Sequence, residues 1–380
     1  MTQSHQVRNQ AASPGEHPAY LTSQLITCIG NKRSLLPEIG RVIDDIRSRL
    51  GGRRLQTLDA FAGSGAVSRL LKSRSSLVVT NDLETYARVI GECYLRNSRE
   101  VDWPEVEAAL DHLRDLDRHL DQHEPGFIER LYAPADETRI TASDRVFYTK
   151  RNARRLDVFR RALDDYDDVT RTMLLGPLLA EASIHANTAG VFKGFYKDRQ
   201  TGIGRFGGSG AEALSRITGP IVPRAPVLSA FESERLVLQV DANDLPDRVG
   251  DLDIAYLDPP YNQHPYGSNY FMLNLLATYQ EPETMSRVSG IPPGWQRSDY
   301  NVRARAGARL ADLVTRIDAR YLVVSYNDEG FVSPAEMRAI LGEAGMVTEH
   351  AIPYNAFRGS RNLAGRAVHV TEHLFVVRKR

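Results

Sequence analysis

The fold is decided by residues 55–82, "LQTLDAFAGSGAVSRLLKSRSSLVVTND". An apolar segment runs into a turn with two glycines, a stretch of helical spacing follows, and a second apolar segment ends on an acid. This succession predicts a strand, a tight turn, a helix and a second strand. Such a unit is typical of a parallel sheet that is covered by helices on both faces.

The same alternation continues along the chain. Apolar residues recur at helical spacing from residue 34 to residue 50, ahead of the first strand. Further β-rich apolar runs occur at residues 235–241, 253–258, 320–327, 351–354 and 373–379. We therefore expect an α/β, Rossmann-like fold with a mostly parallel sheet, whose ligands bind beyond the carboxyl ends of the strands.

A long interval between Glu84 and Glu232 interrupts this alternation. Residues 103–124 are charged and helical in character, and residues 149–166 have the pattern of a basic amphipathic helix. A second helix leads into residues 187–210, which are rich in glycine, basic residues and aromatics. The interval is expected to be an inserted, mainly helical domain that ends in a basic loop or hairpin.

The chain is thus expected to divide into one discontinuous domain and an insert. The expected limits are a flexible polar tail at 1–20, one domain built from 21–98 and 232–380, and the insert at 99–231. With 380 residues, 42% of them hydrophobic, the chain can bury a sizeable core.

Charge and cysteine content limit the partners and the compartment. The 48 basic and 48 acidic residues balance, so a polyanion would have to be held by local basic patches. Two cysteines allow no disulfide framework, and no Cys/His cluster has zinc spacing, so we expect no metal. No apolar run suits a signal peptide or a membrane span, which favours the cytoplasm.

The glycine turn is the first candidate binding element. Asp59 and Phe61 lie where the first strand ends, and Gly63 and Gly65 let the backbone approach a ligand closely. A nucleoside triphosphate loop would need a lysine followed by serine or threonine after Gly65, and a dinucleotide fingerprint would need glycine where Ser68 stands. An ordinary tight turn is the alternative.

The acid after the second strand narrows the ligand. Asp82 follows the glycines by about one strand–helix unit, where an acid can accept hydrogen bonds from both ribose hydroxyls. An adenosine cofactor without a pyrophosphate fits this pattern. Asp241 closes another strand and could accept from the adenine amino group. The alternatives are a helix cap for Asp82 and a turn residue for Asp241.

The second candidate element is "DPPY", residues 258–261. Pro259 and Pro260 supply no N–H and hold the carbonyls around them rigidly. Hydrogen bonds from an adenine amino group to Asp258 and to a proline carbonyl would localise the nitrogen lone pair toward an incoming methyl group. Tyr261 would stack on a base flipped out of a duplex. A strand-terminating turn is the alternative.

Together these residues resemble a known family. The segments "IGNKRSLLPEI", "DAFAGSGAVSRLLK", "NDLETYARVI", "NTAGVFKGFYK", "DPPYNQHPYGSNYFMLN", "RYLVVSYNDEGF" and "HLFVVRKR" are similar, in this order, to the Dam-type adenine-specific DNA methyltransferases. Three of them more narrowly resemble the branch that includes methylases paired with type IIS restriction endonucleases. The resemblance implies an S-adenosylmethionine-dependent methyltransferase sheet and makes residues 99–231 the target-recognition domain.

The resemblance also implies roles for individual residues. Asp258, Pro259, Pro260 and Tyr261 would be the catalytic motif. Phe61, Gly63 and Gly65 would form the cofactor turn, Asp82 would bind the ribose, and Lys32 would contact the cofactor near its methionine end. Beside these, the residues expected to bind the cofactor are Cys28, Asp258 and, from their positions at strand ends, Asp59 and Asp241. Family members usually carry an aromatic residue at the position of Cys28; a packed apolar cysteine is the alternative there.

The basic loop and one strand end supply the remaining candidates. DNA contacts are expected from Lys193, Lys197, Arg199 and Arg205, with a solvated charged loop as the alternative. Residues 325–327, "SYN", would border the base pocket or simply end a core strand.

The expected activity is methyl transfer from S-adenosylmethionine to the amino nitrogen of adenine in duplex DNA, by base flipping and direct transfer, with S-adenosylhomocysteine as product. The expected setting is restriction-modification or orphan modification, with a cognate restriction endonuclease acting on the same site without a stable complex. Two alternatives stay open: an RNA adenine methyltransferase, and a DNA-binding protein that kept the fold and lost the chemistry.

Overall fold

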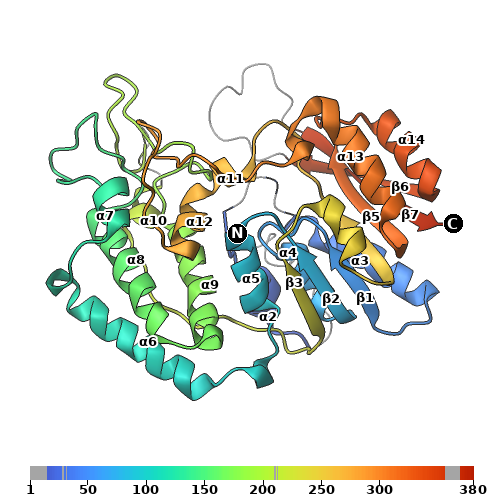
Figure 1. The fold of residues 1–380 in the computed structure, drawn as a ribbon, viewed down its shortest axis with the longest axis horizontal. Coiled ribbons are helices and arrows are strands. Elements are labelled where there is room, and N and C mark those ends of the chain that lie inside the picture. Colours follow the sequence, from blue (N-terminus) through green and yellow to red (C-terminus); the bar gives the residue numbers. More distant parts are fainter. Residues whose placement is uncertain (1–14, 28–29, 31, 209–210, 212, 356–368) are drawn as a thin grey trace.

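The computed structural model describes residues 15–27, 30, 32–208, 211, 213–355 and 369–380. A helical part and a sheet covered by helices lie side by side (Figure 1). The strands are β1 Leu55–Asp59, β2 Ser75–Asn81, β3 Glu234–Leu238, β4 Leu252–Leu257, β5 Ala319–Asn327, β6 Gly345–Asn355 and β7 His369–Lys379. The predicted α/β fold is confirmed.

The seven strands form one sheet in the order β3-β2-β1-β4-β5-β7-β6. Strands β1 to β5 pair in parallel, whereas β7 runs antiparallel to both β5 and β6. The chain moves from β1 to β2 and β3 on one side, and β4 then starts again on the other side of β1. A crevice opens at the carboxyl ends of the strands at such a switch point.

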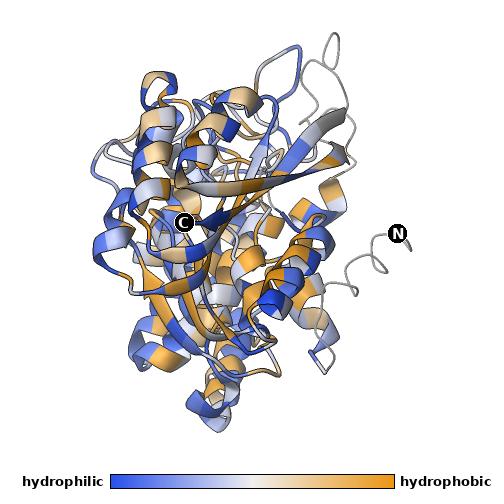
Figure 2. Cartoon of the chain, turned by 90° about the vertical axis from the view of Figure 1, so that its right-hand side faces the viewer, coloured by the Kyte–Doolittle hydropathy of each residue, from blue (hydrophilic) through white to orange (hydrophobic). Residues whose placement is uncertain are grey.

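Helices cover both faces of the sheet. One face carries α3 Leu36–Arg49 and α4 Ala66–Lys72, and the other carries α13 Arg303–Arg316 and α14 Pro334–Ala344. Side chains of β4 alternate between the two faces. Ile254 and Tyr256 belong to the apolar cluster under α3 and α4, and Ala255 and Leu257 belong to a second apolar cluster under α13 and α14. Figure 2 shows hydrophobic residues gathered on the strands and on the sides of the helices that face them.

A third apolar cluster holds the helical part together. Its main helices are α5 Thr85–Tyr94, α6 Trp103–Arg118, α7 Phe127–Tyr132, α8 Lys150–Ala162, α9 Asp168–Ile184 and α12 Phe271–Thr278. The short helices are α2 Pro18–Thr22, α10 Leu214–Thr218, α11 Tyr266–Asn269, η1 Ser98–Glu100, η2 Leu120–Gln122, η3 Leu163–Asp165, η4 Ala242–Asp247 and η5 Asp299–Asn301. Across the described ranges, none of the helices has the length and apolar character that a bilayer span requires.

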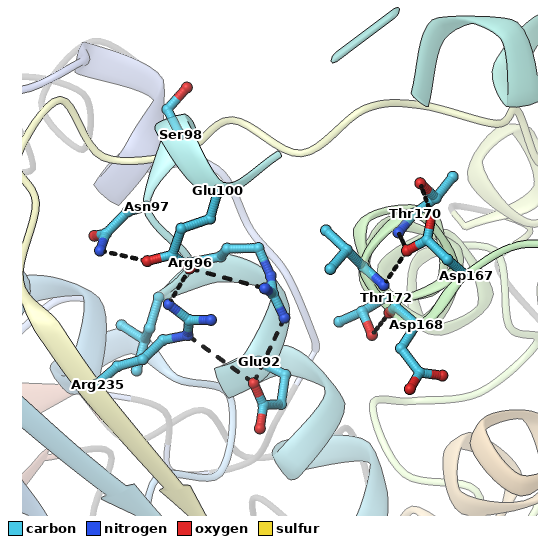
Figure 3. Close-up of polar contacts among 12 residues, drawn as sticks. Glu92, Arg96, Asn97, Ser98, Glu100, Asp167, Asp168, Thr170, Thr172 and Arg235 are labelled. Atoms are coloured by element: carbon cyan, nitrogen blue, oxygen red, sulfur yellow. Dashed lines mark hydrogen bonds and ion pairs between the residues drawn. The ribbon is translucent and has the colours of Figure 1, made fainter. Parts of the chain in front are cut away.

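The stretch of chain between β2 and β3 leaves the sheet and returns to it at one place, whereas α12 joins the helical part from the segment after β4. The Asn97 amide accepts a hydrogen bond from Ser233 N at 3.1 Å and donates one to Ser233 O at 3.1 Å. Asn97 also donates to Glu100 Oε1 at 2.8 Å, and Glu100 pairs with Arg235 of β3 (Figure 3). Neighbouring points of departure and return are what an insert requires, so we keep the division at residues 99 and 231 as a proposal.

The expected flexible tail is corrected at its end. Residues 1–14 lie outside the described residues, but α2 begins at Pro18. Tyr20 is buried, and its hydroxyl donates to Tyr94 O at 2.8 Å. The segment is ordered because its apolar side chains, Tyr20 and Leu21, pack into the cluster under α3 and α4.

Candidate active site

A pocket opens at the carboxyl ends of β1, β2 and β4. Its empty space, including the part open to solvent, is about 890 Å³. The predicted residues that line it are Lys32, Asp59, Phe61, Gly63, Asp82, Asp241, Asp258 and Pro260. Three further candidates, Gly65, Pro259 and Tyr261, do not line the pocket but lie next to lining residues in the sequence. Cys28 lies outside the described residues.

The glycine turn is preformed. Gly63 has φ +53° and Gly65 has φ +70°, a region that favours glycine. A Cβ on Gly65 would also stand only 3.1 Å from Ile90 Cγ2 of α5. Gly63 N donates to Asp82 Oδ2 at 2.8 Å, so the turn after β1 is tied to the acid after β2.

Asp82 holds two elements together at the edge of the pocket. Its Oδ2 accepts from the glycine turn, and its Oδ1 accepts from Glu84 N at 2.9 Å, just before α5. Burial raises the pKa of Asp82, and these backbone donors oppose the shift. A carboxylate oxygen can accept more than one hydrogen bond, so this bracing role is compatible with the predicted contact to ribose hydroxyls.

Asp59 carries an unsatisfied acceptor in the pocket. Its side chain is 1% exposed, and Ser68 Oγ donates to Oδ2 at 2.6 Å. Its buried Oδ1 has no hydrogen-bond partner among the residues that the structure describes. Burial raises the pKa of Asp59 to about 7. Leaving a buried acceptor unpaired is costly, so the position suits a ligand that brings a donor or a positive charge.

Asp241 is a turn residue at the start of η4, which is the alternative role predicted for it. Its Oδ1 accepts from Asn243 N at 2.9 Å and so caps η4, and Arg309 Nη2 lies 3.4 Å away. The same side chain lines the pocket. A contact to the adenine amino group therefore stays a prediction beside the turn role.

The catalytic motif belongs to a buried cluster of charges. Tyr261 donates from its hydroxyl to Asp258 Oδ1 at 2.5 Å, and Lys32 Nζ lies 3.1 Å from the same oxygen. Lys32 also donates to the Tyr261 hydroxyl. The Tyr261 ring meets Tyr326 edge-on, with centroids 4.8 Å apart. The tyrosine thus orients the acid in this structure, and its stacking on a base stays a prediction.

The charge states in this cluster follow from burial and pairing. Burial raises the pKa of Asp258 to about 6, with Lys32 opposing and Glu372 reinforcing the shift. Burial alone would lower the pKa of Lys32, but Asp258 and Glu372 outweigh it and raise the value to about 12. At neutral pH the lysine is therefore protonated and Asp258 is a carboxylate that can accept hydrogen bonds.

Two acids of the site, Glu372 and Glu84, were not predicted from the sequence. Glu372 of β7 lies with Oε1 2.9 Å from Lys32 Nζ, and Ser325 Oγ donates to that oxygen at 2.7 Å. Ser325 thus belongs to the cluster, whereas Asn327 ends β5 and accepts from Glu329 N. Glu84 lines the pocket, and burial raises its pKa to about 8. An acid at the start of the last strand was the available signal for Glu372.

The basic loop has the form of a short hairpin. Asp198 N donates to Ile203 O at 2.8 Å, and Arg205 N donates to Tyr196 O at 2.9 Å. Lys193, Arg199 and Arg205 are exposed, whereas Lys197 is half-buried, with its ammonium 5.0 Å from the centre of the Phe195 ring. Phe192 N donates to Asn269 O, which places the loop beside the segment that follows "DPPY".

Comparisons with known proteins identify similar chains. Residues 29–340 match the family described as D12 class N6 adenine-specific DNA methyltransferase. The chain is 29% identical over 332 residues to type II methyltransferase M.NlaIII of Neisseria lactamica, covering 84% of this chain and 90% of that protein. It is 26% identical over 342 residues to type II methyltransferase M.CviAII of Paramecium bursaria Chlorella virus 1, covering 88% of this chain and 94% of that protein. It is 23% identical over 360 residues to type II methyltransferase M.FokI of Planomicrobium okeanokoites, covering 92% of this chain and 52% of that protein.

Proposed function

The chain belongs to the family of D12 class N6 adenine-specific DNA methyltransferases, and from this premise we propose how its pocket performs the transfer. The protein is a site-specific DNA methyltransferase that acts on the amino nitrogen of adenine. The observation that carries the proposed mechanism is that Asp59 and Asp82, from the glycine-turn side, line the same pocket as Asp258. One half of this pocket would hold the methyl donor and the other half the adenine.

S-adenosylmethionine is the proposed cofactor, and when bound it supplies a methyl group on a positively charged sulfur. Asp82 would accept hydrogen bonds from the ribose hydroxyls while it braces the glycine turn. The unpartnered Oδ1 of Asp59 would accept from a cationic ammonium group. Phe61 lines the pocket edge-on to Tyr300, with ring centroids 5.1 Å apart, and offers an apolar contact to an adenine ring. The acidic lining suits a cationic ligand.

Asp258 would orient the adenine amino group for attack. Its contacts with Lys32 and Tyr261 both involve Oδ1, so they leave Oδ2 for an N–H of the base. A carbonyl of the rigid diproline would accept the second N–H. Two such acceptors localise the lone pair on the amino nitrogen and direct it toward the methyl group. Asp258 acts here as an acceptor and need not remove a proton before attack. The methylated nitrogen would then lose one proton, either to Asp258 or to water.

The helical part would recognise the target. We place the DNA-recognition role in residues 99–231, with Lys193, Lys197, Arg199 and Arg205 as contacts to DNA, most of them to phosphates. The names of the relatives, type II methyltransferase and modification methylase, support a role in restriction-modification. A restriction endonuclease that acts on the same site, without a stable complex, and a cytoplasmic location belong to this proposal.

Transfer of a tritiated methyl group from S-adenosylmethionine tests the proposal. The purified chain is incubated with duplex DNA and, separately, with RNA of matching sequence, and the labelled base is identified after digestion. Label on the amino nitrogen of adenine in the duplex is expected. Label on RNA alone would assign the chain to RNA modification, and DNA binding without label would assign it to the non-catalytic class.

A further inference from the structure

Glu372 is a buried acid to which the proposed mechanism assigns no role. It lies in β7 opposite Asn327 of β5 and is 3% exposed. Three side chains reach its Oε1: Lys32 at 2.9 Å, Tyr261 at 3.0 Å and Ser325 at 2.7 Å. All three contacts fall on one oxygen, so they tie Glu372 Oε1 into the cluster around Asp258.

Two of its partners are also the partners of Asp258. Lys32 Nζ lies 3.1 Å from Asp258 Oδ1 and 2.9 Å from Glu372 Oε1, so one ammonium is shared by two carboxylates. The Tyr261 hydroxyl is likewise within 2.5 Å of Asp258 and 3.0 Å of Glu372. If Asp258 were the only carboxylate beside the buried ammonium of Lys32, electrostatic attraction would draw the ammonium closer to Asp258. Here the second carboxylate balances that attraction.

We propose that Glu372 is a positioning residue for the methyl transfer, which holds Lys32 and Tyr261 on one oxygen of Asp258 and keeps the other oxygen available to the adenine amino group. The inference rests on the proposed function. Without the charge of Glu372, Lys32 would move fully onto Asp258 and compete with the base for its acceptor positions. The pairing of β5 with β7 extends over seven residue pairs from Tyr321 to Asn327, so the strand does not depend on this side chain.

The charge of Glu372 also bears on the protonation of Asp258. It raises the pKa of Asp258, whereas Lys32 lowers it. Asp258 also interacts electrostatically with Asp59 and Tyr256. The titratable groups that face Asp258 are therefore Lys32, Asp59, Tyr256, Tyr261 and Glu372. Removal of one negative charge from this set shifts the titration of Asp258 to lower pH.

The test is Glu372→Gln, which keeps the shape of the side chain and removes its charge. We expect kcat to fall about 10- to 100-fold, with the KM for DNA changed less than about threefold, because positioning at the reacting atoms is lost. The acid limb of the pH–rate profile should move to lower pH. A purely structural role of Glu372 would not lower kcat at a nearly unchanged KM in a variant that is folded.

Two further variants keep the test interpretable. Ser325→Ala removes one donor to Glu372 and should lower kcat about two- to fivefold, in line with the loss of one hydrogen bond. Glu349→Gln makes the same substitution on β6, where Glu349 pairs with Arg338 at 2.7 Å, and should leave kcat and the pH profile unchanged. Thermal unfolding of each variant verifies that it is folded.

Two results would overturn the inference: a Glu372→Gln enzyme with wild-type kcat, or one that is slower but has an unshifted acid limb. A wild-type protein that transfers no label to duplex DNA would overturn the proposed function and this role with it. Normal transfer by both the wild type and Glu372→Gln would overturn this role alone. The two failures are therefore distinguishable.

Discussion

The pocket and the basic loop carry charged side chains in opposite ways. In the pocket, Asp59 and Lys32 are almost fully buried, and Asp258 is bonded to two neighbours. In the loop, backbone hydrogen bonds hold the chain, while Lys193, Arg199 and Arg205 extend into solvent. A buried charge needs a fixed partner and acts at one defined position, whereas an exposed charge contributes little by itself. Substitutions should therefore have large effects in the pocket and small ones in the loop.

The largest effect is expected at Asp258. Asp258→Ala removes the acceptor for the adenine amino group and should lower kcat by about 1,000-fold or more, because an interaction made with the reacting atoms is lost. DNA binding, measured by gel shift, should stay within about threefold. Asp247→Ala is the matched control, since Asp247 is exposed and forms an ion pair with Arg316. Methyl transfer by Asp258→Ala within tenfold of the wild type would contradict the mechanism.

Asp82 should be next in the series. Asp82→Ala removes the ribose acceptor and also releases Gly63 N and Glu84 N. The Kd for S-adenosylmethionine, measured by calorimetry, should rise about 10- to 100-fold, as expected for the loss of charge-assisted hydrogen bonds. Asp82→Asn, which keeps one acceptor oxygen, should lose less. Unchanged affinity in both variants would leave Asp82 with the bracing role alone.

Substitution of Asp59 should stabilise the fold but weaken the binding of S-adenosylmethionine. Asp59→Asn removes a buried carboxylate whose pKa is raised to about 7, so the free energy of unfolding at pH 7 should rise by about 1 kcal/mol or more. This gain should shrink as the pH falls and vanish near pH 3, below the pKa of about 3.9 that an aspartate has in the unfolded chain, where the carboxyl is neutral in both states. Affinity for S-adenosylmethionine should fall about tenfold with the lost charge. Chemical denaturation at both pH values, with calorimetry at pH 7, measures the two effects.

The smallest effects are expected in the loop. Arg199→Ala or Lys193→Ala should each raise the KM for DNA about two- to fivefold, and each should reduce the salt dependence of binding by about one phosphate contact. Arg320→Ala, an exposed arginine at the start of β5, is the control. If neither variant changes the salt dependence, the loop does not contact the phosphates and the alternative of a solvated loop holds.

Much of the pocket could be predicted because its residues follow strand ends. Asp59, Asp82 and Asp258 each lie at the carboxyl end of a buried strand or directly after it, and β1, β2 and β4 are parallel neighbours. Parallel strands bring their carboxyl ends to one edge of the sheet, so local patterns were sufficient to group these acids. The roles of Asp241 and of the basic loop residues could not be decided from the sequence. A residue that forms a turn and a residue that contacts a ligand can stand in the same local sequence pattern.

The residues that escaped prediction depend on pairings between distant parts of the chain. Glu372 reaches Lys32 only because β7 inserts antiparallel between β5 and β6, and a register shift of one residue would turn its side chain to the other face. Asn97 and Ser233 meet only because the chain returns to the sheet beside its point of departure.

Short-range periodicity and turn chemistry, which are written into neighbouring residues, thus established the strands, the glycine turn and the order of the acids. Long-range packing and strand register decided which buried charges share a partner, because those depend on contacts that no local stretch encodes.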